Sequence, residues 1–216
     1  MSRRRAHQKG MTLVELLVAM TVTVLLSTLI IGSWITLTNA YSFNARSSKQ
    51  RDVANLAIAR MAREIRDAQK PAPTVNAFAQ AYQYEVRFYS TFNEAGADNP
   101  SQPPRLTRFV LVDGGNGIGT IYRDEAVDGV FGNGDDVRTT LVKDVVNRRQ
   151  STDLFTYSAI SDTTGTMYQS LGVTTLVPPA KIQTVRIVLF VDLNPGRSPS
   201  YMDISTTVEP RNMRHL

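Results

Sequence analysis

The sequence predicts an α+β fold in which one long N-terminal helix packs its C-terminal half on an antiparallel β-sheet. Two observations predict the helix: residues 16–37 carry no charge, and no proline occurs between Met11 and Lys70. A third predicts the sheet, because after Pro71 short segments of alternating apolar and polar residues are separated by glycine, proline and asparagine. The 216 residues leave room for one globular domain besides the extended helix.

The predicted helix, residues 11–70, has two parts of different character. Residues 16–37 would extend about 33 Å at 1.5 Å per residue, which is enough to cross a hydrocarbon core of about 30 Å. Residues 38–70 are amphipathic, and we expect their apolar stripe to pack on the chain's own domain rather than serve only partner helices. This stripe consists of Ala54, Ile58, Met61, Ile65 and Ala68. Pro71 and Pro73 end the helix, because proline lacks the N–H group and disfavours helix in the residue before it.

The remaining residues, 71–216, are expected to form a β-rich globular domain. Strands are predicted at residues 82–88, 105–112, 119–123, 137–146, 181–193 and 201–208. The last two form the clearest antiparallel pair, since the glycine and prolines of residues 194–199 provide a turn between them.

Composition excludes several classes of function. The net charge of +5 comes mainly from residues 1–10 and 46–70, whereas residues 71–216 contain more acidic than basic groups. We therefore do not expect the domain to bind nucleic acid. There is no cysteine, and the two histidines, His7 and His215, lie near the chain ends. We therefore do not expect disulfides, thiol catalysis, a histidine-based hydrolase or a histidine-ligated zinc site. More generally, we do not expect this chain to be an enzyme.

Charge asymmetry predicts the orientation of the apolar segment. Arg3–Arg5 and Lys9 precede it, so the N-terminus is expected in the cytoplasm and residues 71–216 outside. Three alternatives to cleavage near Gly10 stay open. They are a secretory signal cut after Thr38-Asn39-Ala40, a twin-arginine signal and an anchor that is never cleaved.

Glu15 stands at the start of the apolar run, where an ionised carboxylate costs about 2.5–3.5 kcal/mol on membrane insertion. One interpretation is that Glu15 marks the membrane interface. The other is that a cation neutralises it: a cut after Gly10 would give Met11 a free amine about 6 Å away along the helix. Pairing with that amine, in the same subunit or a neighbour, would also select the stagger between subunits.

The run Lys9-Gly10-Met11-Thr12-Leu13-Val14-Glu15-Leu16 resembles the type IV prepilin processing motif. The resemblance implies that residues 1–10 are a leader removed by prepilin peptidase, and that Met11 is then N-methylated. It implies an inner-membrane protein that assembles through Glu15 with other pilins or pseudopilins, on an inner-membrane platform, into a filament. Methionine stands where phenylalanine is usual. Gly32 also fits the family, whose members often have a helix breaker in this part of the helix.

Residues 56–68 and the ending at residues 208–212 are similar to J-type pseudopilins of type II secretion and related minor pilins. This similarity implies a structural, low-copy subunit of a pilus or of a secretion pseudopilus. The alternatives are a tip adhesin, a DNA-uptake minor pilin, or a membrane-anchored extracytoplasmic domain that acts alone.

One segment could hold a metal ion. Residues 124–136 contain five carboxylates among three glycines, namely Asp124, Glu125, Asp128, Asp135 and Asp136. Calcium prefers six to eight oxygen ligands from a flexible loop, but the spacing does not match an EF-hand. A solvated acidic turn is the favoured interpretation and calcium binding the alternative; no other cofactor is expected.

Overall fold

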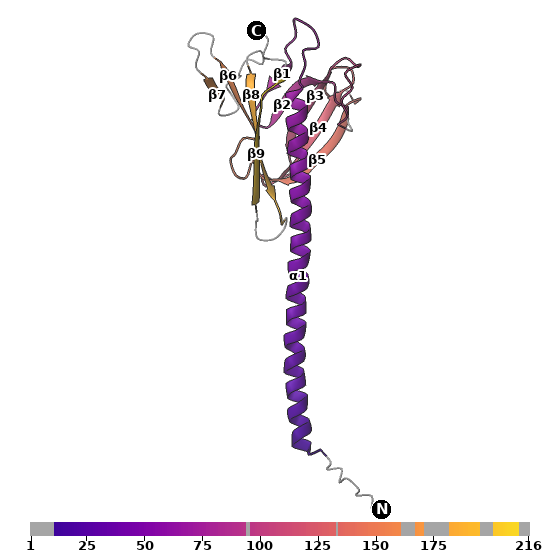
Figure 1. Cartoon of the computed structure of the whole chain (residues 1–216), viewed down its shortest axis with the longest axis vertical. Helices are drawn as coiled ribbons and strands as arrows, with labels where there is room; N and C mark the ends of the chain where they lie inside the picture. Colours follow the sequence, from indigo (N-terminus) through magenta and orange to yellow (C-terminus); the bar gives the residue numbers. More distant parts are fainter. Residues whose placement is uncertain are drawn as a thin grey trace, which may run out of the picture. The chain divides into compact units, whose positions relative to one another are not determined.

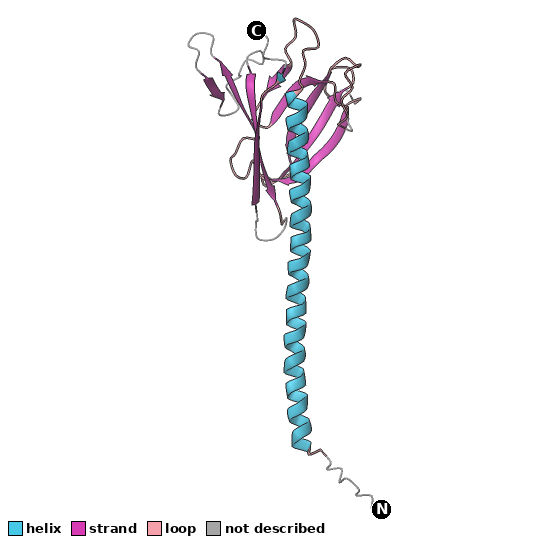
Figure 2. Cartoon of the chain, viewed as in Figure 1, coloured by secondary structure: helices cyan, strands magenta, loops and turns pink. Residues whose placement is uncertain are grey.

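The computed structural model describes residues 11–93, 96–132, 134–160, 167–170, 182–194 and 201–211. One helix precedes an antiparallel sheet, which is the expected α+β arrangement and is found in pilins (Figures 1 and 2). The chain divides into two compact units, Met1–Ala45 and Arg46–Leu216. The elements are α1 (Leu13–Arg66), β1 (Phe78–Ala81), β2 (Glu85–Ser90), β3 (Arg105–Asp113), β4 (Gly119–Ala126), β5 (Val137–Val145), β6 (Phe155–Ile160), β7 (Met167–Ser170), β8 (Ile182–Asp192) and β9 (Tyr201–Val208).

Helix α1 ends at Arg66, before the expected end at Lys70. In its last turn the amide of Asp67 still donates to the carbonyl of Arg63 at 3.2 Å. The amide of Gln69 instead donates to the carbonyl of Tyr89 at 2.9 Å, which directs the chain towards strand β2. The helix is therefore stopped by a contact with the sheet before the prolines are reached.

In the part of the chain that the structure describes, the sheet has nine strands in the order β1-β2-β3-β4-β5-β8-β6-β7, with β9 paired to the other side of β8. Strands β8 and β9 pair from Val185 opposite Val208 to Asp192 opposite Tyr201, which confirms the predicted hairpin. Of its predicted turn, residues 194–199, only Asn194 lies within the described residues.

The predicted strand 82–88 is wrong at its start. The amide of Tyr82 donates to the carbonyl of Glu85 at 2.7 Å, so residues 82–84 turn the chain between β1 and β2. Strands β1, β6 and β7 were not predicted at all. Two of them, β1 and β7, are four residues long, which is too short for alternation to stand out.

Strands β5 and β8 pair at a single position, Val145 opposite Val191. The buried side chain of Asn147 extends this narrow junction. Its Nδ2 donates to the carbonyl of Val188 at 2.7 Å, and its Oδ1 accepts from the amide of Phe190 at 2.8 Å. Asn147 thus forms with its side chain the two hydrogen bonds that a further strand residue would form with its backbone.

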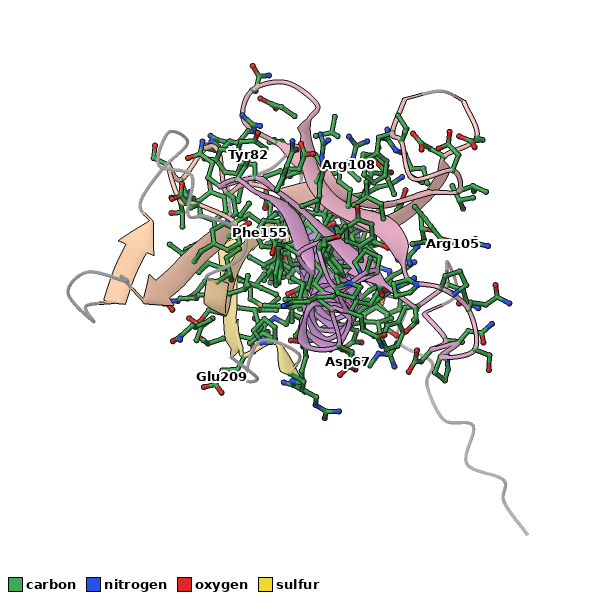
Figure 3. All side chains as sticks on the ribbon, turned by 90° about the horizontal axis from the view of Figure 1, so that it is seen from above. Asp67, Tyr82, Arg105, Arg108, Phe155 and Glu209 are labelled. Carbon is green, nitrogen blue, oxygen red and sulfur yellow. The ribbon has the colours of Figure 1, made fainter. Side chains whose placement is uncertain are left out.

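The core lies between the C-terminal part of α1 and the sheet. All five residues of the predicted apolar stripe are buried, so packing of this stripe on the chain's own domain is confirmed. They meet aromatic residues of the sheet, among which the rings of Phe88 and Phe109 lie 5.4 Å apart. Seen from above, strand side chains converge on the end of α1, and Arg108 points away from the helix (Figure 3).

Candidate functional site

The first turn of α1 is closed by a reciprocal cap between Thr12 and Glu15. The carboxylate Oε2 of Glu15 accepts hydrogen bonds from the backbone N and the Oγ1 of Thr12, both at 2.9 Å. The amide of Glu15 donates back to the Oγ1 of Thr12 at 3.3 Å. This is the capping-box arrangement, in which threonine is followed three residues later by glutamate. Sequence reasoning missed the role of Thr12, although the spacing was visible.

The cap gives Glu15 a local function, and it also leaves part of the carboxylate available. Both hydrogen bonds from Thr12 reach Oε2, and no bond to Oε1 is formed by any described residue. An ionised carboxylate can accept about four hydrogen bonds, so a capped Glu15 can still receive an ammonium group. Met11 precedes the helix and is 66% exposed, whereas Gly10 lies outside the described residues.

The helix beyond Glu15 exposes its apolar side chains. Within the described residues, α1 is the one helix that is long and apolar enough to cross a membrane. All residues of α1 from position 13 to position 41 are exposed. Such a surface must be covered by lipid or by other helices, because water is an unfavourable solvent for a contiguous apolar patch of this size.

Threonine hydroxyls in this apolar segment are satisfied inside the helix. Thr23 donates to the carbonyl of Ala19 at 2.7 Å, and Thr36 donates to the carbonyl of Gly32 at 3.0 Å. Thr21, Thr28 and Thr38 form bonds of the same kind. Their hydroxyls can therefore enter an apolar environment without leaving a donor unpaired.

At the other end of α1, Glu64 forms a buried ion-pair network with strand β4. Its Oε2 accepts from the Nε of Arg123 at 2.9 Å, and its Oε1 accepts from the Nε of Arg60 at 2.9 Å. Glu64 and Arg123 are both fully buried. Arg123 also donates to Glu125 Oε2 at 3.0 Å and to the carbonyl of Phe92 at 2.6 Å. This network determines the axial position of the C-terminal part of the helix on the sheet and its rotation about its own axis.

Glu64 departs from the amphipathic pattern of residues 38–70. A charged residue is expected on a polar side of such a helix, but the structure buries Glu64 beside Ile65 of the apolar stripe. A buried carboxylate is tolerated only when it is paired and hydrogen-bonded. The partner Arg123 lies two residues after the buried Ile121 in β4, so strand alternation places both on the inward face. Its pairing with Glu64 depends on how the helix packs on the sheet, which the local sequence does not indicate.

On the opposite face of the sheet, Asp124 joins arginines from the two neighbouring strands. It accepts from the Nε of Arg108 at 3.0 Å and from the Nε of Arg138 at 2.7 Å. Burial alone would raise the pKa of Asp124, but the hydrogen bonds from Arg138 and Arg108 outweigh it, so the pKa lies below its ordinary value. The ring of Phe131 covers the Arg108 guanidinium, with 4.5 Å between the guanidinium carbon and the ring centre.

The structure does not bring the five carboxylates of residues 124–136 together. Asp124 and Glu125 lie on opposite faces of β4, and each is paired with arginines. In the following loop, Asp128 accepts from the amide of Val130 at 2.9 Å, and Asp136 accepts from the amide of Gly132 at 2.7 Å. No group of three or more metal-ligating side chains occurs among the described residues. Calcium binding stays an untested prediction.

Comparison with known proteins identifies the N-terminal segment. Residues 5–31 match the family model of the prokaryotic N-terminal methylation motif. No curated protein and no solved structure matches the chain. The matched residues include Met11, Glu15 and the start of the apolar helix, and they support a type IV prepilin-like protein. The exposed apolar helix fits a single-pass membrane anchor.

Proposed function

We propose that this chain is a structural subunit of a type IV pilus or of a type II secretion pseudopilus. It is made as an inner-membrane precursor, cleaved by prepilin peptidase between Gly10 and Met11, and N-methylated at Met11. The observation that carries the proposal is the match to the methylation motif at residues 5–31, which includes the start of an apolar helix whose residues 13–41 are all exposed. Such a helix needs partners that the described residues do not supply.

The proposed mechanism of assembly depends on Glu15. Cleavage creates an ammonium group on Met11. The Oε1 of Glu15, which Thr12 does not bond, accepts a hydrogen bond from this ammonium group in the same subunit or in a neighbour. An unpaired charge inside an apolar helix bundle is strongly unfavourable, so pairing selects one axial position for each incoming subunit. Residues 71–216 form the exported domain and take no part in the pairing.

We further infer a minor subunit that resembles J-type pseudopilins and does no catalysis. Its partners are prepilin peptidase, other pilins or pseudopilins, and the inner-membrane assembly platform. Residues 56–68, in the amphipathic part of the helix, are similar to the same part of J-type pseudopilins, and this similarity supports the narrower assignment. Quantitative mass spectrometry of purified filaments tests it: a minor subunit is present at a few copies per filament, whereas a ratio near that of the main component contradicts it.

The decisive experiment is to determine the mature N-terminus. Mass spectrometry of the protein from its own host is expected to find methylated Met11 as the first residue. A Gly10→Val variant should accumulate as a precursor in the membrane, while Gly10→Ala serves as a milder control. A mature protein that begins at Met1, or one that begins at Tyr41 after a secretory cut, would contradict the proposal.

A further inference from the structure

Three cations follow the uncharged stretch of helix α1: Arg46, Lys49 and Arg51. All three are exposed, and none forms an ion pair or a hydrogen bond with another described residue. Asp52 is the one acidic residue between positions 46 and 52, so this segment keeps a net positive charge. We call Arg46, Lys49 and Arg51 the cationic collar.

The uncharged stretch of α1 that precedes the collar is about as long as a membrane is thick. Residues 16–45 contain no aspartate, glutamate, lysine or arginine, and all of them lie in α1. At 1.5 Å per residue this stretch is about 45 Å long. A bilayer including its headgroups is about 40–45 Å thick. When Glu15 lies at the cytoplasmic surface, Arg46 therefore lies at the outer surface.

Helix geometry also directs the collar side chains towards the bilayer. In an α-helix each Cα–Cβ bond is tilted towards the N-terminus, which is the membrane side for these residues. The long stems of arginine and lysine can extend along this direction and place their charges among the headgroups. Arg51 lies about 7.5 Å beyond Arg46, which is within one Debye length of about 8 Å at physiological salt.

Other cations of α1 are either engaged or too distant to share this role. Arg60 donates to Glu64 at 2.9 Å, and Arg63 donates to the carbonyl of Gly96 at 2.6 Å. Arg66 lies about 30 Å beyond Arg46, several Debye lengths from the headgroups. Cleavage of the leader also removes Arg3–Arg5 and Lys9, so the collar becomes the main cationic segment next to the membrane.

We propose that Arg46, Lys49 and Arg51 bind the phosphate groups of anionic phospholipids in the outer leaflet. The proposal rests on the single-span anchoring that is part of the proposed function. It assigns the collar a role in holding the mature subunit at a fixed depth before assembly. An acidic protein surface would satisfy the same charges, but the match between helix length and bilayer thickness favours lipid.

The test uses the full chain in vesicles and needs one label. Because the chain has no cysteine, Ser48→Cys allows a single fluorescent donor within the collar, at an exposed position. Energy transfer is measured to acceptor-labelled phosphatidylglycerol and, separately, to acceptor-labelled phosphatidylcholine at equal mole fraction. We expect about twofold more transfer to phosphatidylglycerol at 20 mM salt, and equal transfer near 1 M salt, where the Debye length is about 3 Å.

Matched variants localise the effect. Arg46→Gln/Lys49→Gln should lose most of the preference, whereas Arg66→Gln/Lys70→Gln removes the same charges farther along the chain and should retain it. Equal transfer to both lipids in the unmutated chain would overturn the proposal, and so would an equal loss in both double variants. If lipid preference is absent but Arg46→Gln/Lys49→Gln still impairs assembly, the collar binds protein and the lipid proposal is wrong.

A separate measurement tests the membrane anchoring on which the collar proposal rests. Protease protection of the same vesicles shows whether the chain spans the bilayer once, with residues 46–216 on one side. Loss of that topology contradicts membrane anchoring itself. Correct topology without lipid preference contradicts the collar proposal alone.

Discussion

Helix α1 contains two glutamates, Glu15 in its first turn and Glu64 near its last, and their partners differ in distance along the chain. Glu15 is bonded to Thr12, three residues away, in an exposed turn. Glu64 is bonded to Arg123, 59 residues away, and both side chains are fully buried. Glu15 is thus satisfied locally. Glu64 also accepts a local bond from Arg60, but its buried partner Arg123 is brought to it only by the fold of the domain.

This difference has a physical consequence for each region. The N-terminal region needs nothing from the domain to form its helix, and its exposed apolar surface remains available for lipid or other helices. The C-terminal region has no such independence, because a buried charge without its partner is strongly destabilising. Mutations should therefore affect assembly at one end and folding at the other.

The largest expected effect on folding comes from Arg123→Met. It leaves Glu64 and Glu125 buried without their main partner, and we expect a loss of about 3–5 kcal/mol in the free energy of unfolding of residues 46–216. Calorimetry of the full chain in detergent measures it. The double variant Glu64→Leu/Arg123→Met should recover part of the loss, since it removes a buried charge; no recovery would contradict the ion-pair explanation.

A smaller loss is expected for Asn147→Ala. This change leaves the carbonyl of Val188 and the amide of Phe190 without partners at the narrow junction of β5 and β8. The expected cost is about 2–3 kcal/mol, by the same calorimetric measurement. The control Asn55→Ala changes an exposed asparagine of α1 and should cost much less. Equal effects of the two substitutions would show that Asn147 does not join the strands.

The third effect depends on pH and involves Asp124. Because its pKa is lowered in the folded state, its contribution is present above the unfolded value of about 3.9 and is lost as pH falls through the folded value. Asp124→Asn should cost about 1–2 kcal/mol at pH 7 and flatten the loss of stability below pH 4. Chemical unfolding between pH 2 and 7 tests this, and unchanged acid sensitivity in the variant would contradict it.

Glu15→Leu should have the smallest effect on the stability of the domain, and we expect none that calorimetry resolves. Insertion and cleavage should also persist, since the change removes a polar cost from the apolar segment. Assembly should fail, because the Met11 ammonium would enter the helix bundle unpaired. The assay is the fraction of mature protein in sheared filaments, or cross-linked to partner subunits, with Glu15→Gln as an intermediate case. Normal incorporation would leave Glu15 only its capping role.

The same contrast explains what the sequence could predict. The helix, its apolar stripe and the β8–β9 hairpin follow from local periodicity, and all three were predicted. The burial of Glu64 was missed, because it depends on Arg123 from a distant strand. Strand β1 was missed since four residues give too weak a pattern. In the acidic segment, alternation along β4 separates Asp124 from Glu125, which composition alone does not reveal.

The contacts of α1 with the sheet also determine how the domain would carry force. Besides the pair of Glu64 with Arg123, the Nε2 of Gln50 donates to the Oδ2 of Asp144 at 2.9 Å. These two attachments are about 21 Å apart along the helix axis. A pull along that axis loads both in shear, together with the apolar stripe between them, instead of peeling one contact after another. The domain should therefore stay attached to its helix under tension, and its rupture should be a single cooperative event.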